Sequence, residues 1–473
     1  MLVGVGGRRP GRPGGWLRWS LVAAVVVVLL GTTAGALALT APGLVPGLGV
    51  APTSAATPPP VPRPVLGPLP ADAPQPSAAG LAAVLDDRAA AVPGRFSGVV
   101  VDPAGGEPVW QRDADRALVP GSTGKILTAA ATLLTLNPTD TLVTRVLAGP
   151  DPGTVVLVGA GDPTLSALPA DRPGVYPDAP RLADLAAQVE QAAPAPVTTV
   201  LVDTSLYAGP TLADGWQPGD IAAGYITPIE PLMVDGGRID PTLQDGPRVT
   251  DPALTAGRAL AGLLGADPDG VAVTTADPDA QRLASVSSAP VSELVEHMLR
   301  SSDNVLAETL ARQVALSRQG EPSFAGAGEQ VLAALAQAGF DPSGAVLADG
   351  SGLSTTDRVP ARLLGSLLAA AAAPTDGARG PEFLRPVLTG LPVAGGDGTL
   401  DDRFVPGTDA AGGRGVVRAK TGTLTGVSSL AGVVTDADGR LLVFALMSNG
   451  ASPAATRPRL DAMAAELSAC GCR

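Results

Sequence analysis

An uncharged apolar run near the N-terminus determines which part of this chain can form a packed domain. The run extends from Trp19 to Leu39 and follows a basic stretch that contains Arg8, Arg9, Arg12 and Arg18. Basic residues before an apolar run keep the N-terminus inside and send the following sequence across the membrane. We therefore expect residues 1–18 to be a cytoplasmic tail and the sequence after the run to fold outside the cytoplasm.

Residues 19–39 have two interpretations. The apolar centre is as short as that of a signal peptide, and Ala36-Leu37-Ala38 resembles a cleavage site. The whole uncharged run is also long enough to span a bilayer as a signal anchor, the interpretation that we slightly favour. An uncleaved anchor would attach the protein to the membrane through this segment. Both interpretations place the remaining residues outside the cytoplasm.

The folded region is expected to begin after a linker. Residues 40–80 are rich in Pro and Ala, which favours an extended linker over a packed unit. Residues 147–284 contain short β-branched runs separated by Gly, Pro and Asp turns. We interpret 147–284 as an inserted, mainly-β or α+β region. It interrupts one domain, whose two parts are 81–146 and 285–473.

The interrupted domain is predicted to be of the α/β class, with an antiparallel sheet flanked by helices. Hairpins are expected at 96–110 and at 429–449, the second with a type I′ or similar turn at Asp438-Gly439. Stretches rich in Ala and Leu indicate helices. These helices are expected at 81–92, 125–136, 291–316, 328–338, 360–373 and 454–468.

The charge balance and the scarcity of His and Cys exclude several classes of protein. Asp and Glu number 45 against 32 Lys and Arg, a net charge of −13, which argues against nucleic-acid binding. One histidine, His297, and two cysteines, Cys470 and Cys472, nearly exclude a His/Cys metal site and a disulfide scaffold. We expect no cofactor. The cysteines either pair with each other or stay free, and any histidine-based triad would have to use His297.

The chain contains only two lysines, Lys125 and Lys420. Unlike Arg, a Lys side chain can lose its proton when its pKa is lowered. Ser122 lies three residues before Lys125, so a helix would place the hydroxyl and the amine on one face. Since a serine is a weak nucleophile until a base takes its proton, this pair is a candidate nucleophile and base.

The second lysine begins the run Lys420-Thr421-Gly422-Thr423, at the end of an expected strand. A strand edge can pair with an extended peptide, and a glycine there permits close approach. Lys420 would supply a second cation beside the first lysine. It would also attract a carboxylate of the substrate.

Ser302-Asp303-Asn304 lies within the helical stretch 291–316 and has two interpretations. All three residue types are good helix N-caps, so the triplet can simply begin a helix. Alternatively, Ser302 and Asn304 both point into a cleft, where a hydroxyl can relay a proton and an amide can bind a substrate carbonyl.

Together, S-x-x-K, S-D-N and K-T-G form a signature of β-lactamases and penicillin-binding proteins. Their order and the long gap between Ser122 and Ser302 resemble the class C type-4 penicillin-binding proteins, the D-alanyl-D-alanine carboxypeptidase/endopeptidase family. One departure is Gly124, where a bulkier apolar residue is usual. Further stretches resemble the family: GAGDPTL at 159–165, VDTSLYAG at 202–209, ADGSGLS at 348–354, LPVAGGDGTL at 391–400 and AKTGTLTGVSSLAG at 419–432.

The resemblance implies a penicillin-binding/β-lactamase-like transpeptidase fold. It also implies an acyl transfer reaction on peptidoglycan stem peptides that end in D-Ala-D-Ala. Ser122 would be the acylated nucleophile, Lys125 its base and Ser302 a proton relay. The backbone N–H groups of Ser122 and Thr423 would form the oxyanion hole. β-Lactams, which resemble the substrate terminus, would acylate Ser122 and inhibit the protein. This activity belongs at the outer face of the cytoplasmic membrane or in the cell wall.

The resemblance also implies the residues that hold the substrate. Asn304 would bind the substrate amide, and Lys420 would hold the cation and orient the terminal carboxylate with Thr421 or Thr423. Gly422 would let the substrate peptide lie against the strand. Asp162, Asp203 and the turn from Asp349 to Ser354 are more simply turn or cap residues.

Two alternatives stay open on sequence alone. A β-lactamase or esterase of the same fold would use the same serine, but no Glu lies four residues before an Asn and no Y-x-N occurs. The sequence therefore shows no residue placed for rapid deacylation. A non-catalytic cell-wall-binding protein is the other alternative. The intact Ser, Lys and Asn residues argue against it.

Overall fold

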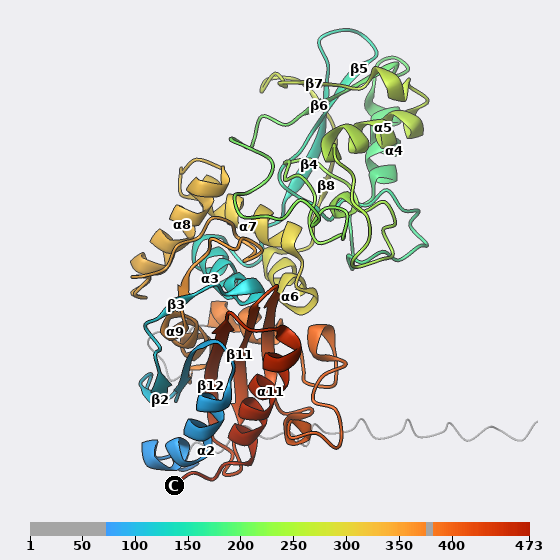
Figure 1. Cartoon of the computed structure of the whole chain (residues 1–473). Helices are drawn as coiled ribbons and strands as arrows, with labels where there is room; N and C mark the ends of the chain where they lie inside the picture. Colours follow the sequence, from blue (N-terminus) through green and yellow to red (C-terminus); the bar gives the residue numbers. More distant parts are fainter. Residues whose placement is uncertain (1–71, 375–381) are drawn as a thin grey trace, which may run out of the picture. The chain divides into compact units, whose positions relative to one another are not determined.

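The computed structural model describes residues 72–374 and 382–473. The expected tail 1–18, the apolar run 19–39 and most of the linker lie outside these ranges. Within the described ranges, no helix is both long and apolar enough to cross a membrane. Two five-stranded sheets organise this part of the chain (Figure 1).

The first sheet is antiparallel and has the strand order β10-β11-β12-β1-β2. Segments from opposite ends of the described chain therefore meet in it, and β10 forms one edge. A separate pair joins β3 (Ala117–Leu118) to β9 (Val359–Pro360). The strands of the first sheet are β1 (Arg95–Val101), β2 (Pro108–Arg112), β10 (Arg418–Leu424), β11 (Val427–Thr435) and β12 (Leu441–Asn449).

Side chains of this sheet alternate between two hydrophobic cores, because successive residues of a strand point to opposite faces. On β12, Val443 and Met447 pack into a core with helices α3, α6, α7, α8 and α9. Leu442 and Phe444 pack into a second core with helices α2 and α11. The predicted antiparallel sheet flanked by helices is therefore confirmed.

The helices lie close to where the Ala- and Leu-rich stretches predicted them, with two differences. The stretch 291–316 is divided into two helices, α6 and α7, rather than one. A short helix, α10 (Arg385–Thr389), was not predicted. The others of this domain are α2 (Ala78–Ala91), α3 (Lys125–Thr135), α6 (Val291–Ser301), α7 (Asn304–Ser317), α8 (Phe324–Gln337), α9 (Ala361–Ala372) and α11 (Pro453–Ala469).

The predicted hairpin between β11 and β12 forms, but its turn is not of type I′. A type I′ turn needs a positive φ at both central residues. Here only Gly439, with a φ of 85°, adopts it, and Asp438 does not. The Gly439 N–H donates to the carbonyl of Asp436, so the glycine follows a turn at 436–439 instead of sitting in its centre.

The second sheet is mixed and has the order β7-β6-β5-β4-β8. It begins with β4 (Val143–Ala148) and ends with β8 (Arg282–Ser287), slightly outside the predicted bounds of 147–284. Between them lie β5 (Thr154–Val158), β6 (Thr199–Asp203) and β7 (Ala272–Thr274), together with helices α4 (Leu182–Ala192) and α5 (Pro252–Leu264).

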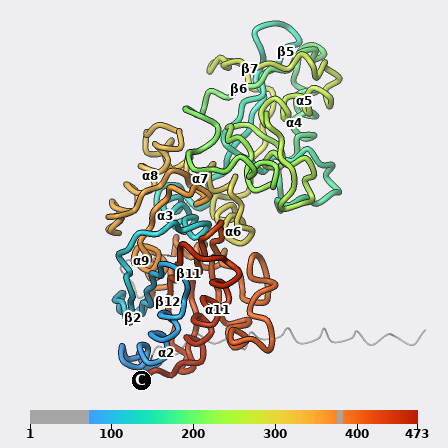
Figure 2. The backbone as a smooth tube through the Cα atoms, in the orientation of Figure 1, coloured from blue at the N-terminus to red at the C-terminus, as the bar shows by residue number. Residues whose placement is uncertain are grey.

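A long loop leads from β6 to α5 within the inserted region. Residues 204–251 contain neither an α-helix nor a strand, and Figure 2 shows their irregular course. Several of their groups bond to α7 and to the segment before it, including the carbonyl oxygens of Ala208 and Tyr225. This loop joins the inserted region to the rest of the fold.

The pairing of β10 with β11 depends on Gly432. A Cβ atom at Gly432 would lie 2.0 Å from the Arg418 carbonyl oxygen. We therefore expect Gly432→Ala to lower the free energy of unfolding by about 1–3 kcal/mol, as overpacked sites do. Gly262 lies in α5 with nothing near its would-be Cβ. Gly262→Ala should leave stability unchanged or raise it by up to about 1 kcal/mol. Thermal unfolding of both variants tests this, and equal stabilities would contradict it.

Candidate active site

The side chains of Ser122 and Lys125 meet as the sequence predicted. A 3₁₀ turn, Gly121–Gly124, carries the serine and leads directly into α3, which begins at Lys125. The Lys125 Nζ donates to Ser122 Oγ at 3.1 Å. The Thr123 hydroxyl fixes the turn by donating to the Pro120 carbonyl at 2.7 Å. The serine thus faces the amine from a turn with defined geometry.

Lys125 is fully buried, and its hydrogen-bond acceptors are neutral oxygens. Besides the serine, Nζ donates to Asn304 Oδ1 and to the Ser351 carbonyl, at 2.8 Å for the latter. Burial lowers the pKa of Lys125 to about 8, although Asp349 and then Glu308 act in the opposite direction. The lowered pKa makes the neutral amine easier to reach near neutral pH than that of an exposed lysine.

The turn between α6 and α7 presents Ser302 and Asn304. Ser302 adopts a left-handed conformation, with φ 60° and ψ 34°, which ends α6. Asp303 then caps α7, since its carboxylate accepts from the Leu306 N–H at 2.9 Å. The two interpretations of this triplet are therefore compatible: its middle residue is an N-cap, and its outer residues face the two lysines.

Lys420 reaches the same turn from β10. Its Nζ donates to Ser302 Oγ at 2.9 Å and to the Thr421 carbonyl at 3.0 Å. Burial and the charge of Lys125 lower the pKa of Lys420 well below its usual value. A charge on Lys125 thus disfavours a proton on Lys420.

Gly422 brings β10 against the turn that carries the serine. A Cβ atom there would lie 2.1 Å from Ser429 Oγ, 2.5 Å from the Pro120 carbonyl oxygen and 3.1 Å from the Ser122 nitrogen. Only glycine fits this approach. It places the Ser122 backbone next to the strand that carries Thr423.

The three predicted motifs therefore converge, but in two bonded pairs. Ser122 is bonded to Lys125, and Ser302 is bonded to Lys420. Asn304 joins the first pair. Among the predicted binding residues, Thr421 is buried with its hydroxyl 2.8 Å from Thr399 Oγ1, whereas Thr423 is exposed at the end of β10.

Sequence reasoning missed how the loop 349–354 supports Lys125. The Asp349 carboxylate accepts N–H bonds from Ser351, Gly352 and Ser354, at 3.0, 2.6 and 2.7 Å. It also accepts from the indole of Trp216 at 2.7 Å. This loop aims the Ser351 carbonyl at Nζ. The sequence indicated only a turn here, because a carbonyl acceptor leaves no mark on residue identity.

Other singled-out residues lie apart from these contacts. His297 packs on the Tyr176 ring, 5.5 Å between centroids, and its Nε2 has no hydrogen-bond partner in the described ranges. Cys470 is paired with Cys472 in a disulfide. Asp162 and Asp203 accept backbone N–H bonds within turns. Nowhere in 72–374 or 382–473 do three or more His, Cys, Asp or Glu side chains form a metal-binding group.

Comparison with known proteins gives consistent matches across the chain. The D-Ala-D-Ala carboxypeptidase 3 (S13) family matches residues 77–248 and 246–470. Carboxypeptidase Rv3627c of Mycobacterium tuberculosis is 46% identical over 424 residues, 88% of this chain and 90% of that protein. Carboxypeptidase DacB of Mycolicibacterium smegmatis is 44% identical over 471 residues, 98% of this chain and 99% of that protein.

A solved structure shows the same fold. Penicillin binding protein 4 (dacB) from Haemophilus influenzae matches with a TM-score of 0.65 at 21% identity, over 80% of this chain and 97% of that chain. The predicted penicillin-binding fold is therefore confirmed.

The left-handed backbone of Ser302 should show in stability measurements. For an L-residue other than Gly this conformation costs about 1–2 kcal/mol. We expect Ser302→Gly to be more stable to unfolding than Ser302→Ala by about 1 kcal/mol. The neighbouring Ser301 is helical. There the order should reverse, with Ser301→Gly less stable than Ser301→Ala by up to about 1 kcal/mol. Denaturant unfolding of the four variants tests this, and the same order at both positions would contradict it.

Proposed function

Because this chain belongs to the D-Ala-D-Ala carboxypeptidase 3 (S13) family, we propose that it cleaves the terminal D-Ala from peptidoglycan stem peptides. The family resemblance found in the sequence is thus confirmed, and with it the prediction of a serine-type D-Ala-D-Ala carboxypeptidase. The reaction proceeds through an ester on Ser122. One observation carries the assignment of this serine: the buried Lys125 amine donates to its hydroxyl at 3.1 Å.

In the first step, Ser122 Oγ attacks the carbonyl carbon of the scissile D-Ala-D-Ala bond. The neutral Lys125 amine takes the hydroxyl proton as the new C–O bond forms. The backbone N–H groups of Ser122 and Thr423 hold the oxyanion. The close approach at Gly422 supports this assignment, since it brings β10 to the serine turn.

The C–N bond then breaks, and the leaving D-Ala amine needs a proton. Ser302, whose hydroxyl is bonded to Lys420 Nζ at 2.9 Å, is the relay that passes to this amine the proton that Lys125 took from Ser122. Asn304 binds the substrate amide carbonyl. Lys420, with Thr421 or Thr423, orients the terminal carboxylate along β10. Water finally hydrolyses the ester, which releases the shortened peptide and restores the serine.

The same serine ester explains how the chain would respond to its other ligands. β-Lactams resemble the D-Ala-D-Ala terminus and would acylate Ser122. Endopeptidase cleavage of cross-linked stem peptides uses the same acyl chemistry. Such a substrate supports a location in the cell wall or at the outer face of the cytoplasmic membrane, with residues 19–39 acting as signal anchor or signal peptide. For the domains, we propose that 81–146 and 285–473 form one domain and that 147–284 is inserted into it.

Penicillin labelling tests the nucleophile. Wild-type protein should bind a fluorescent penicillin covalently and release D-Ala from a peptide ending in D-Ala-D-Ala. Ser122→Ala should lose both activities because no other hydroxyl receives the Lys125 bond. Ser343→Ala, at an exposed turn, is the matched control and should retain both. Label on Ser122→Ala equal to that of wild type would refute the assignment. Rapid hydrolysis of a chromogenic cephalosporin would instead favour a β-lactamase.

The pH dependence of acylation tests the base. The reactive form of Lys125 is neutral, so the acylation rate should rise with pH and level off above the pKa of about 8. The titratable groups around this amine are Asp349, Glu308, Asp303, Asp357 and Lys420.

Two substitutions near Lys125, Asp349→Asn and Asp357→Asn, separate the effect of a charged carboxylate on its pKa from the effect of a structural change. Asp349 contributes the largest carboxylate effect that raises the pKa of Lys125, so Asp349→Asn should move the midpoint to lower pH. Burial raises the pKa of Asp357 to about 10, so this group is neutral near pH 7 and Asp357→Asn should move the midpoint less. Stopped-flow measurement with a reporter penicillin gives both profiles. A rate independent of pH between 6 and 9 would refute Lys125 as the base.

A further inference from the structure

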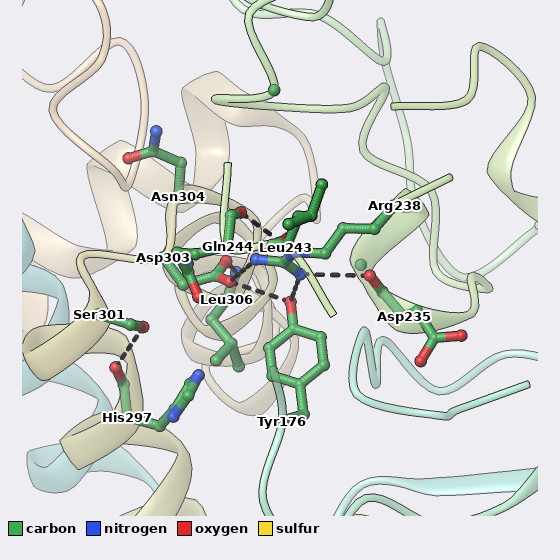
Figure 3. Close-up of polar contacts among 12 residues, drawn as sticks. Tyr176, Asp235, Arg238, Leu243, Gln244, His297, Ser301, Asp303, Asn304 and Leu306 are labelled. Carbon is green, nitrogen blue, oxygen red and sulfur yellow. Dashed lines mark hydrogen bonds and ion pairs between the residues drawn. The ribbon is translucent and has the colours of Figure 1, made fainter. Parts of the chain in front are cut away.

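A buried ion pair connects the inserted region to the turn that carries Ser302 and Asn304. Arg238, in the long loop between β6 and α5, donates through Nη2 to Asp303 Oδ2 at 2.9 Å. The side chains are 0% and 1% exposed, respectively. Tyr176, also from the inserted region, donates to the same oxygen at 3.0 Å. Figure 3 shows these groups converging on Asp303.

The local chain is shaped around the Arg238 guanidinium. Its Nη1 donates to Tyr176 Oη at 2.9 Å and to the Asp235 carbonyl at 3.2 Å, and its Nε donates to the carbonyls of Leu243 and Gln244. Gly236 has a φ of 62°, and a Cβ atom there would lie 2.7 Å from Nη1. A lysine has no planar fork of donors and cannot reproduce these contacts.

Asp303 is placed so that this pair affects both neighbouring residues. Its Oδ1 caps α7 at Leu306, while its Oδ2 receives Arg238 and Tyr176. Although burial raises the pKa of Asp303, Arg238 and Arg248 lower it overall, so the carboxylate is charged. A buried charge without its partner is strongly unfavourable, so the turn must follow the position of the guanidinium.

A second contact from the inserted region fixes the orientation of Asn304. The Tyr225 carbonyl accepts from Asn304 Nδ2 at 2.9 Å. The amide is thereby turned so that its Oδ1 faces Lys125 Nζ. The same loop, 204–251, thus contacts two residues of the triplet, Asp303 through Arg238 and Asn304 through Tyr225.

We propose that Arg238 and Tyr176 are positioning residues that set the Ser302–Asn304 turn against the two lysines. The inserted region is then part of the catalytic apparatus, although it contributes no group to the reacting bond. The proposal rests on the function assigned to Ser302 and Asn304 above. It predicts that weakening the pair slows the chemical step more than it weakens noncovalent binding.

Arg238→Lys and Arg248→Lys form a matched pair for the test. Both keep the charge of a buried arginine in the same loop. Arg248, however, donates to the carbonyls of Gly224, Gly236 and Gln244 and not to the turn. A purely structural role would therefore affect both variants similarly. Circular dichroism and thermal unfolding identify the temperature at which each variant is folded. Tyr176→Phe, which removes one hydroxyl, serves if Arg238→Lys does not fold.

The limiting rate of acylation and the dissociation constant of the noncovalent complex are measured separately with a reporter penicillin. We expect Arg238→Lys to lower the limiting rate between about tenfold and a hundredfold, as small misplacements of reacting groups do. Its dissociation constant should change less than its rate. Arg248→Lys keeps its charge near Asp303 and makes no bond to the turn, so it should lose much less of the limiting rate than Arg238→Lys does. Equal rate losses in the two variants, or none in Arg238→Lys, would overturn the proposal.

Crystal structures of wild type and Arg238→Lys, or of Tyr176→Phe in its place, separate this proposal from the proposed function. Movement of Ser302 Oγ away from Lys420 Nζ in the variant supports the positioning role even if wild type does not react with penicillin. An unmoved turn refutes the positioning role even if wild type reacts fully. Absence of label on wild type refutes the proposed function alone.

Discussion

The structure depends on the burial of two lysine amines that are satisfied by neutral oxygens. In the described part of the chain, neither Lys125 nor Lys420 forms an ion pair with a carboxylate. A carboxylate in contact would stabilise the ammonium form and remove the base. Hydroxyl, amide and peptide oxygens satisfy the donors and leave the neutral form accessible. Carboxylates are still present, but they bind backbone N–H groups of the 349–354 loop.

This arrangement requires segments that are far apart in the sequence to meet without side chains between them. Glycines make the meeting possible where backbones touch. Gly422 brings β10 to the serine turn, and a Cβ atom at Gly352 would lie 2.0 Å from the Gly121 carbonyl oxygen. The same turn is therefore contacted by the strand on one side and by the 349–354 loop on another. Loss of the loop contact would remove the Ser351 carbonyl that accepts from Lys125, and loss of the strand contact would free the backbone of the serine turn.

Sequence reasoning identified side chains whose residue type the chemistry requires. It missed groups that the residue type does not reveal, such as a backbone carbonyl. The contact between Ser122 and Lys125 was predictable because residues three apart lie on one face of a helix. The helices and hairpins followed from composition and turn residues. The Ser351 carbonyl was not predictable, since every residue has one. Arg238 was hidden among many arginines, and only the fold reveals that it faces Asp303. The break between α6 and α7 was foreseen only as one of two interpretations of Ser302-Asp303-Asn304, and the left-handed backbone of Ser302 was missed.

The Ser302–Asn304 turn explains why capping and catalysis need not compete for the same residues. An N-cap residue must leave helical geometry, so the chain before α7 has to turn sharply, and Ser302 does so at a positive φ. That turn projects Ser302 Oγ toward β10, while Asn304, the first residue of α7, projects toward Lys125. A continuous helix over 291–316 would place these side chains about 200° apart, with two residues at 100° each. The cap is therefore the structural device that lets one short triplet serve both lysines, and the buried Arg238–Asp303 pair holds that device in place.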